Sequence, residues 1–312
     1  RGYTIGHQLL ERVEKSGAEV WLNTLVYGMQ KDCSLGVIHD DQHWTIKAKK
    51  VIVATGAKEN YLAFPGSTLP GVMGAGAAQT MINVNRVLPG QRILMLGSGN
   101  VGLIVSYQLM QAGADVVALV EAAPNIGGYG VHAGKIRRAG VPFYISHTIK
   151  AVTGDGQVEH VELVQVDKMF KPIPGTEKTF DVDTVCLAVG LNPMTELIWM
   201  AGCKFCFIPA FGGHVPLHTE DMETTVPGLY VAGDVTGVEE ASSAMEEGNM
   251  AGVAAAEALG FLTAEDAEKK KVEIRGRLNI LRSGMFGERR RTAKTSQLQS
   301  MSDYQAQKGG VQ

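Results

Sequence analysis

Apolar and polar positions alternate along the chain with periods that predict both helices and strands. Between Thr4 and Gly17, apolar residues recur every three or four positions, which predicts an amphipathic helix. Apolar stretches of strand length follow at 18–27, 35–39, 43–48 and 50–54, with Asp40-Asp41 turning a hairpin. Small residues then predict a helix over 73–86. The first third of the chain is therefore expected to be mostly strands between two helices.

From residue 92 the pattern becomes a regular succession of strand and helix, which is typical of an α/β fold. Strands are predicted at 93–96, 115–121 and 142–145, with helices at 100–112 and ending near 139. Three strands, 147–152, 158–166 and 179–189, are expected to close this unit as an antiparallel appendage. Later elements are a helix over 194–201, an irregular Cys/His segment, a strand over 228–232 and a helix over 240–259. The last fifty residues predict a charged helix and then a frayed tail, with 289–291 as a solvated basic run.

Composition narrows the class of protein. The chain has 312 residues, 29 Lys and Arg against 32 Asp and Glu, and a net charge of −3, which excludes a strong basic attraction to nucleic acid or anionic membranes. Apolar residues make up 45% and charged residues 20%, so we expect a folded chain with a substantial core. The 38 glycines exceed average usage and indicate many tight turns.

Two further absences bear on location. No stretch approaches the length of a membrane-spanning helix, and the first residues lack the pattern of a signal peptide. Four cysteines, at 33, 186, 203 and 206, are too few for a dense disulfide framework. The sequence therefore predicts a cytoplasmic protein. Because it opens directly into a helix without an initiator Met, residue 1 is not expected to be a natural start.

A glycine-rich loop carries the first functional signal. The run Gly97-Ser98-Gly99-Asn100-Val101-Gly102 follows the apolar strand 93–96 and opens a helix. Gly97 permits the tight turn, Gly99 lets the backbone approach a pyrophosphate, and Gly102 allows close packing of helix on strand. The helix N-terminus would hold the phosphate. This context predicts a dinucleotide or adenine-nucleotide site.

Glu121 extends this interpretation to the sugar. It ends the second strand, where its carboxylate can accept hydrogen bonds from the adenosine ribose. Ala122 and Ala123 provide no cation for a 2′-phosphate, so NAD(H) is favoured over NADP(H). Two alternatives stay open: the glycines serve turn and packing geometry only, or the loop holds ATP or ADP in a noncatalytic scaffold that stabilises an oligomer.

Three more segments reveal a family resemblance: 51–56 ending in Thr55-Gly56, 186–190 ending in Gly190, and 226–234 ending in Gly233-Asp234. Their order around the glycine loop resembles the two-dinucleotide flavoprotein superfamily of pyridine nucleotide-disulfide oxidoreductases, over about residues 1–260. The resemblance implies an α/β, Rossmann-like FAD/NAD(P)-binding fold with a three-layer ββα sandwich. An NAD domain (89–190) would be inserted in an FAD domain (1–88 and 191–262), followed by a C-terminal helix and tail (263–312).

The resemblance also assigns roles. Thr55 and Gly56 would cross beside the FAD, and Asp234 would hold a flavin ribitol hydroxyl. The helix that begins near Ala241 would aim its positive N-terminus at the pyrimidine side of the flavin. The alternative at this place is a capped helix after an ordinary strand. We name no catalytic acid or base, since the cofactor would carry the chemistry.

Within the superfamily, residues 239–248 and 213–216 resemble alpha subunits of heteromeric dye-linked amino-acid and opine dehydrogenases, and cyanide-forming glycine dehydrogenase subunits. This likeness implies an FAD-dependent oxidoreductase that moves hydride between a small-molecule substrate or NAD(H) and flavin. It also implies a second flavoprotein subunit, with a homo-oligomer as the alternative. The family's first strand, glycine loop and helix are missing before Gly97. The FAD domain is therefore expected to be truncated, either because these residues are a fragment of a longer chain or because a partner supplies the missing part. This leaves FAD binding by these 312 residues alone in question and would expose a sheet edge.

The cysteines depart from the family as well. No redox pair stands where disulfide reductases carry one. Cys203, Cys206, His214 and His218 have the spacing C-x2-C-x7-H-x3-H, so a zinc site or thiol-redox site is an alternative function. We favour thiols packed as small apolar groups and histidines on a surface hairpin.

Overall fold

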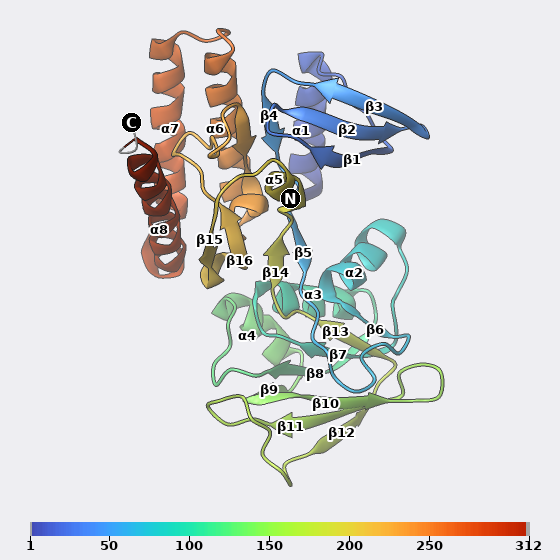
Figure 1. Cartoon of the computed structure of the whole chain (residues 1–312). Coiled ribbons are helices and arrows are strands. Elements are labelled where there is room, and N and C mark those ends of the chain that lie inside the picture. Colours follow the sequence, from blue (N-terminus) through green and yellow to red (C-terminus); the bar gives the residue numbers. More distant parts are fainter. Residues whose placement is uncertain (1, 310–312) are drawn as a thin grey trace. The chain divides into compact units, whose positions relative to one another are not determined.

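The computed structural model describes residues 2–309 and shows two compact units. Unit 1 combines Arg1–Gly56 with Pro193–Gln312, and unit 2 is Ala57–Asn192. The chain therefore leaves unit 1 once and returns to it once, which makes unit 2 an insertion (Figure 1). At the two passages, β5 (Ala57–Glu59) and β14 (Leu191–Pro193) pair as a two-stranded sheet.

Unit 2 is built on a parallel five-stranded sheet. Its strands lie in the order β6 (Val72–Gly74), β13 (Thr184–Leu187), β7 (Arg92–Leu96), β8 (Asp115–Glu121) and β9 (Phe143–Ile145). The helices are α2 (Ala75–Thr80), which continues into the π-helical turn η1 (Met81–Asn85), α3 (Asn100–Gln111) and α4 (Gly130–Arg138). The predicted helix over 73–86 thus begins as the end of β6, because residues 72–74 pair with β13.

An antiparallel sheet covers the other face of the parallel one. It consists of β10 (His147–Thr153), β11 (His160–Gln165) and β12 (Lys178–Asp181). Alternate residues of β7 face opposite ways: Ile93 and Met95 pack with the helices, whereas Leu94 and Leu96 pack with the antiparallel sheet. Burial on both faces explains why β7 is apolar throughout. These layers form the expected ββα sandwich, so the predicted fold class is confirmed.

One predicted strand of this unit was wrong. The stretch 179–189 is two strands that belong to different sheets: β12 pairs antiparallel with β11, and β13 pairs parallel with β7 and β6. The break falls at Val182 and Asp183. The Asp183 carboxylate accepts hydrogen bonds of 2.8–3.2 Å from the backbone N–H groups of Gln91 and Arg92, just where β7 begins.

Unit 1 holds three small sheets and most of the helices. An antiparallel meander, β1 (Thr24–Met29), β2 (Ser34–His39) and β3 (Gln42–Lys47), follows α1 (Gly2–Ser16). β4 (Val51–Val53) pairs parallel with β17 (Leu229–Val231). The remaining elements are α5 (Glu196–Met200), the hairpin β15 (Phe205–Ile208) and β16 (Gly213–Pro216), the 3-10 turns η2 (Pro209–Phe211) and η3 (Gly233–Thr236), α6 (Ala241–Ala258), α7 (Ala264–Leu281) and α8 (Gly284–Gly309).

Strand β17 divides the core of unit 1. Leu229 and Val231 pack toward the meander beside Met29, while Tyr230 packs against α6 and α7. The meander strand begins at Thr24 rather than at 18, and the segment expected to be irregular contains the β15–β16 hairpin. Within residues 2–309, no helix combines the length and hydropathy needed to cross a bilayer.

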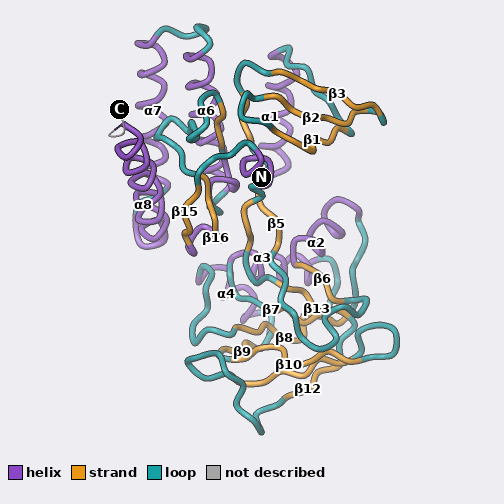
Figure 2. Tube along the Cα trace, viewed as in Figure 1, coloured by secondary structure: helices purple, strands orange, loops and turns teal. Residues whose placement is uncertain are grey.

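The chain does not end in a frayed tail within the described residues. After α7, a second helix, α8, extends to Gly309, and Figure 2 shows α6, α7 and α8 grouped in unit 1. Ala293, Gln297 and Met301 are buried at a spacing of four, so α8 presents one narrow stripe to the core. The many charged and polar residues around this stripe hide its periodicity in the sequence.

The two-sided burial of β7 predicts a large stability loss when a side chain is removed there. Met95 is 0% exposed, and Met169, in a turn of the same unit, is 72% exposed. We expect Met95→Ala to lower the free energy of unfolding by about 2–5 kcal/mol and Met169→Ala by less than about 0.5 kcal/mol. Denaturant unfolding of both variants measures the difference, and equal losses would contradict this description of the core.

Candidate functional site

The glycine loop lies between β7 and α3, at the carboxyl end of the parallel sheet. Gly97 has a φ of 107°, and a Cβ there would lie 2.2 Å from the carbonyl oxygen of Ala188. A Cβ on Gly102 would lie 2.0 Å from the carbonyl oxygen of Gly97, whereas one on Gly99 would meet nothing within 4 Å. Packing therefore requires the first and third glycines, and the second leaves the backbone open at the N-terminus of α3.

A cavity of about 510 Å³ adjoins this loop. Its lining includes Gly97, Ser98, Gly99, Glu121 and Ala122. Gly97 and Ser98 already donate their backbone N–H groups to Val120 and Glu121, so the cavity offers a ligand the loop backbone at Gly99. Val101, in the same loop, is exposed.

Glu121 ends β8 and borders the same cavity. One carboxylate oxygen accepts from the backbone N–H of Ser98 at 3.0 Å and from its hydroxyl, and the other accepts from the N–H of Ala123 at 2.8 Å. Each carboxylate oxygen has about two acceptor positions. The side chain is thus fixed at the cavity wall and retains one acceptor position for a ligand hydroxyl.

Ser98 and Asn100 also hold a neighbouring loop, a role that the sequence did not predict. The Ser98 hydroxyl accepts from the N–H of Gly127 at 2.9 Å, and the Asn100 side-chain oxygen accepts from the N–H of Tyr129 at 2.9 Å. Residues 127–129 are thereby pinned against the glycine loop. Position x of a G-x-G motif carries no periodic signal, so only the structure identifies Ser98 as the partner of Glu121.

The other predicted residues are divided between the units. In unit 2, Gly190 has a φ of 107°, and its carbonyl accepts from the N–H of Asn60 at 3.0 Å. In unit 1, the Thr55 hydroxyl donates to the carbonyl of Met194 at 2.7 Å. The backbone N–H of Met194 in turn donates to the carbonyl of Gly56 at 2.9 Å. Thr55 also lines a largely apolar cavity of about 660 Å³.

The Gly-Asp turn follows β17. Gly233, with a φ of 76°, opens η3, and Asp234 is partly buried in it. Within residues 2–309, the backbone N–H of Glu239 is the one donor to this carboxylate, at 3.3 Å. Burial raises the pKa of Asp234 and nearby carboxylates add to the effect, against the opposing Glu239 hydrogen bond. Ala241 is exposed at the start of α6.

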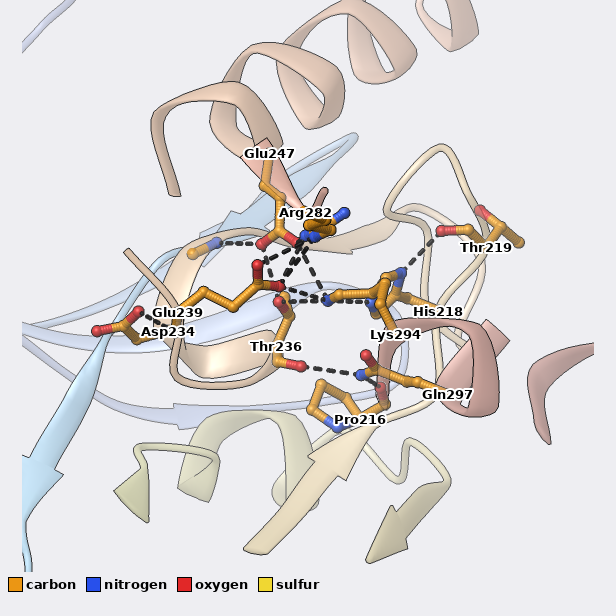
Figure 3. Close-up of polar contacts among 11 residues, drawn as sticks. Pro216, His218, Thr219, Asp234, Thr236, Glu239, Glu247, Arg282, Lys294 and Gln297 are labelled. Atoms are coloured by element: carbon orange, nitrogen blue, oxygen red, sulfur yellow. Dashed lines mark hydrogen bonds and ion pairs between the residues drawn. The ribbon is translucent and has the colours of Figure 1, made fainter. Parts of the chain in front are cut away.

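A buried ionic cluster surrounds this turn (Figure 3). One oxygen of Glu247, on α6, accepts from the Gly233 N–H at 3.0 Å and from the Thr236 hydroxyl at 2.9 Å. The other lies 2.6 Å from Arg282 and 3.0 Å from Lys294. Burial by itself would raise the pKa of Glu247, but the two cations hold it down to about 2. The carboxylate is therefore ionised inside the protein.

A second carboxylate and an imidazole complete the cluster. Glu239 accepts two hydrogen bonds from Arg282, at 3.0 and 2.8 Å. His218 Nδ1 lies 2.7 Å from the carbonyl of Thr219, which can only accept, so Nδ1 carries the proton. Nε2 then accepts from Lys294 at 3.4 Å. Burial first, and the Lys294 charge second, lower the pKa of His218 to about 4, so the ring is neutral.

The basic run at 289–291 is not wholly solvated as expected. Arg290 pairs with Glu240 at 2.7 Å, and Arg291 pairs with Glu288 on its own helix. Glu240 immediately precedes α6, so the Arg290 pair is another link from α8 to the segment after the Gly-Asp turn.

The structure does not bring the Cys/His quartet together. Cys203 packs in the cluster beside the meander and contacts Thr224, while Cys206 packs with Phe211 and Val215. His214 is exposed beside Trp199 and Phe207, and His218 is engaged by Lys294. Burial raises the pKa of both thiols, which disfavours the reactive thiolate. Residues 2–309 contain no group of three or more His, Cys, Asp or Glu that could hold a metal ion, so the quartet fails as a metal site.

The neutral His218 predicts acid sensitivity. Its pKa is about 4 when folded and 6.5 ordinarily, so the unfolded chain binds the proton first and stability falls as pH drops from 6.5 toward 4. The loss is on the order of 3 kcal/mol. We expect His218→Gln to lose this slope and His214→Gln, at an exposed site, to keep it, as measured by denaturant unfolding from pH 7 to pH 4. An unchanged slope in His218→Gln would refute the assignment.

Comparisons with known proteins agree with this geometry. A family model described as pyridine nucleotide-disulphide oxidoreductase matches residues 4–248. An opine oxidase subunit of Agrobacterium tumefaciens is 27% identical over 219 residues, covering 67% of this chain and 44% of the relative. Hydrogen cyanide synthase subunit HcnB of Pseudomonas aeruginosa is 26% identical over 223 residues, covering 66% and 48%. The chain thus spans less than half the length of these two relatives.

A solved structure shares the fold. The thioredoxin reductase of T. acidophilum aligns with a TM-score of 0.65 at 22% identity, covering 80% of this chain and 78% of that chain. At this identity the likeness concerns the arrangement of the elements, not the substrate.

Proposed function

Because the chain belongs to the pyridine nucleotide-disulphide oxidoreductase family, we propose that it is part of a flavin-dependent dehydrogenase in which unit 2 binds NAD(H) and unit 1 contributes to the FAD site. Membership implies FAD and NAD(P) binding and a general oxidoreductase role. The observation that supports the proposal most directly is the open glycine loop, with its cavity and the Glu121 carboxylate at the wall.

The choice of NAD(H) rests on charge beside the ribose position. Glu121 keeps one acceptor position for a ribose hydroxyl, on the oxygen that bonds Ala123, whereas a 2′-phosphate would meet its negative charge. The residues that follow, Ala122 and Ala123, cannot offset that repulsion. The backbone N–H groups of the loop and the N-terminus of α3 would receive the pyrophosphate.

In unit 1 the residues fit a polyhydroxyl chain of the kind that FAD carries. Asp234 has one backbone donor, so its carboxylate retains acceptor positions for hydroxyl groups. The N-terminus of α6, at Ala241, adds a positive potential near the same turn. When bound, FAD would supply the two-electron chemistry, while Thr55, Gly56 and Asp234 would orient it.

Substrate class and partner follow from the relatives by analogy. Two of them are named as subunits of enzymes, an opine oxidase and a hydrogen cyanide synthase. We therefore propose that this chain works with another subunit in the oxidation of an amine or amino acid. Since it spans less than half of these relatives, the activity belongs to the whole assembly.

The ribose assignment predicts a change of nucleotide preference. Replacing Glu121 by Arg removes the acceptor and adds a cation, so NADH should bind about tenfold more weakly and NADPH relatively more tightly. Calorimetric titration measures both affinities. Glu159→Arg, which makes the same charge change at an exposed position of unit 2, should leave them unchanged. An unaltered nucleotide preference in Glu121→Arg would show that the ribose does not lie beside Glu121. Tighter binding of ATP than of NADH, without NADH oxidation, would favour the noncatalytic scaffold.

The flavin assignment predicts a coloured protein. The full-length protein with its natural subunits should show flavin absorption that bleaches when NADH or an amine substrate is added. Asp234→Ala should weaken FAD binding by about tenfold or more, whereas Asp303→Ala, on the exposed side of α8, should not. A colourless protein that cannot be reconstituted with any flavin would end the enzyme interpretation.

A further inference from the structure

We propose that Glu247 is a positioning residue for Asp234, and that Arg282, which caps the C-terminus of α7, and Lys294, on α8, are the two cations on which Glu247 depends. This inference rests on the proposed role of Asp234 in holding a hydroxyl chain of the flavin. It makes the C-terminal helices part of the cofactor site, although neither Arg282 nor Lys294 bonds to Asp234 (Figure 3).

The contacts of Glu247 lie on both sides of Asp234 in the chain. Its one oxygen holds the Gly233 N–H at 3.0 Å and the Thr236 hydroxyl at 2.9 Å. The turn between these two positions is a single 3-10 turn, so fixing both ends fixes the direction of the Asp234 side chain. The Glu239 N–H then bonds to the Asp234 carboxylate from the other side.

The charges of the cluster balance. Glu239 and Glu247 are paired with Arg282 and Lys294, and the neutral His218 adds no charge. A buried carboxylate is stable only when such partners are present, because removing one cation leaves an uncompensated charge. Both glutamates also raise the pKa of Asp234, so loss of a cation would act on the Asp234 carboxylate as well as on the turn.

Helix α8 holds the end of the turn independently. The Gln297 side-chain N–H group donates to the carbonyl oxygens of Thr236 and Pro216, at 2.9 Å each. Lys294 donates to the Thr236 hydroxyl at 3.2 Å and lies 5.0 Å from the centre of the Phe211 ring. Thr236 is therefore hydrogen-bonded to α6 through Glu247 and to α8 through Lys294 and Gln297, and the orientation of the turn depends on both helices.

A neighbouring pair of residues offers a matched control. Glu246 and Arg277 also join α6 to α7, with hydrogen bonds of 2.8 and 2.9 Å, but they lie nearer the surface and do not contact the turn. The same substitutions can therefore be made one residue apart on α6 and five residues apart on α7. Loss of the buried pair destabilises the fold more than loss of the surface pair, so the two pairs are compared through the local exchange and the FAD affinity rather than through stability.

The test compares Glu247→Gln and Arg282→Met with Glu246→Gln and Arg277→Met in the full-length protein and its natural subunits. Two readouts are taken: hydrogen exchange of the Gly233 and Glu239 amides, and affinity for added FAD. We expect the first two variants to exchange these amides faster and to bind FAD about tenfold more weakly. The control variants should stay within about twofold of wild type. Arg282→Lys, which keeps the charge, should recover part of the loss.

Each outcome decides the proposal. Equal effects in the two pairs, or a lower melting temperature with unchanged exchange and affinity, would overturn it. If Glu247→Gln does not fold, Thr236→Val removes one bond to Glu247 and one from Lys294 without changing charge, and it should shift both readouts in the same direction by a smaller amount. Asp234→Ala separates the two proposals. Unchanged FAD affinity in this variant refutes the proposed flavin role of Asp234, while the exchange data still report whether Glu247 holds the turn.

Discussion

The burial of an ionised carboxylate at Glu247 is the constraint around which unit 1 is arranged. A charge in that position must have cations beside it, and the chain supplies them from α7 and α8. Satisfying this requirement brings the C-terminal helices onto the turn after β17. The same requirement explains why α8 is ordered over polar residues that show little periodicity: its buried stripe includes Lys294 and Gln297, which serve the cluster.

The two units would bind nucleotides by different means. In unit 2, backbone geometry dominates, because two glycines satisfy packing and the third leaves N–H groups accessible at the start of α3. In unit 1, the recognising group would be the carboxylate of Asp234, held in a turn that other side chains fix. The residues of a backbone binding loop are consecutive in the sequence. Recognition through an ionic cluster is assembled from residues up to 76 positions apart, as for His218 and Lys294.

That contrast explains what could be predicted. The family resemblance and the fold class were readable from the glycine loop, the Thr55-Gly56 and Gly233-Asp234 segments and their order, and both are confirmed. Glu247 was quoted only as part of a family-like run, since nothing near it in the sequence names Arg282 or Lys294. The strand predicted over 179–189 was wrong because β-forming residues occur in both halves and no Gly or Pro marks the break at Val182 and Asp183. The zinc alternative for the quartet is not supported, because Cys203 and Cys206 pack in different clusters, and of the two histidines expected on a surface hairpin His218 is buried.

Asp183 has a wider importance than ending a strand. Because β7 is apolar on both faces, a shift of one residue would replace one apolar face by another. Hydrophobicity alone therefore cannot select the register of β7 against its neighbours. The Asp183 carboxylate selects the register because it accepts hydrogen bonds from the backbone N–H groups of Gln91 and Arg92, at the end of β7 opposite the glycine loop. The position of the glycine loop against Ala188, which follows β13, is thereby determined by an anchor at the amino end of the strand.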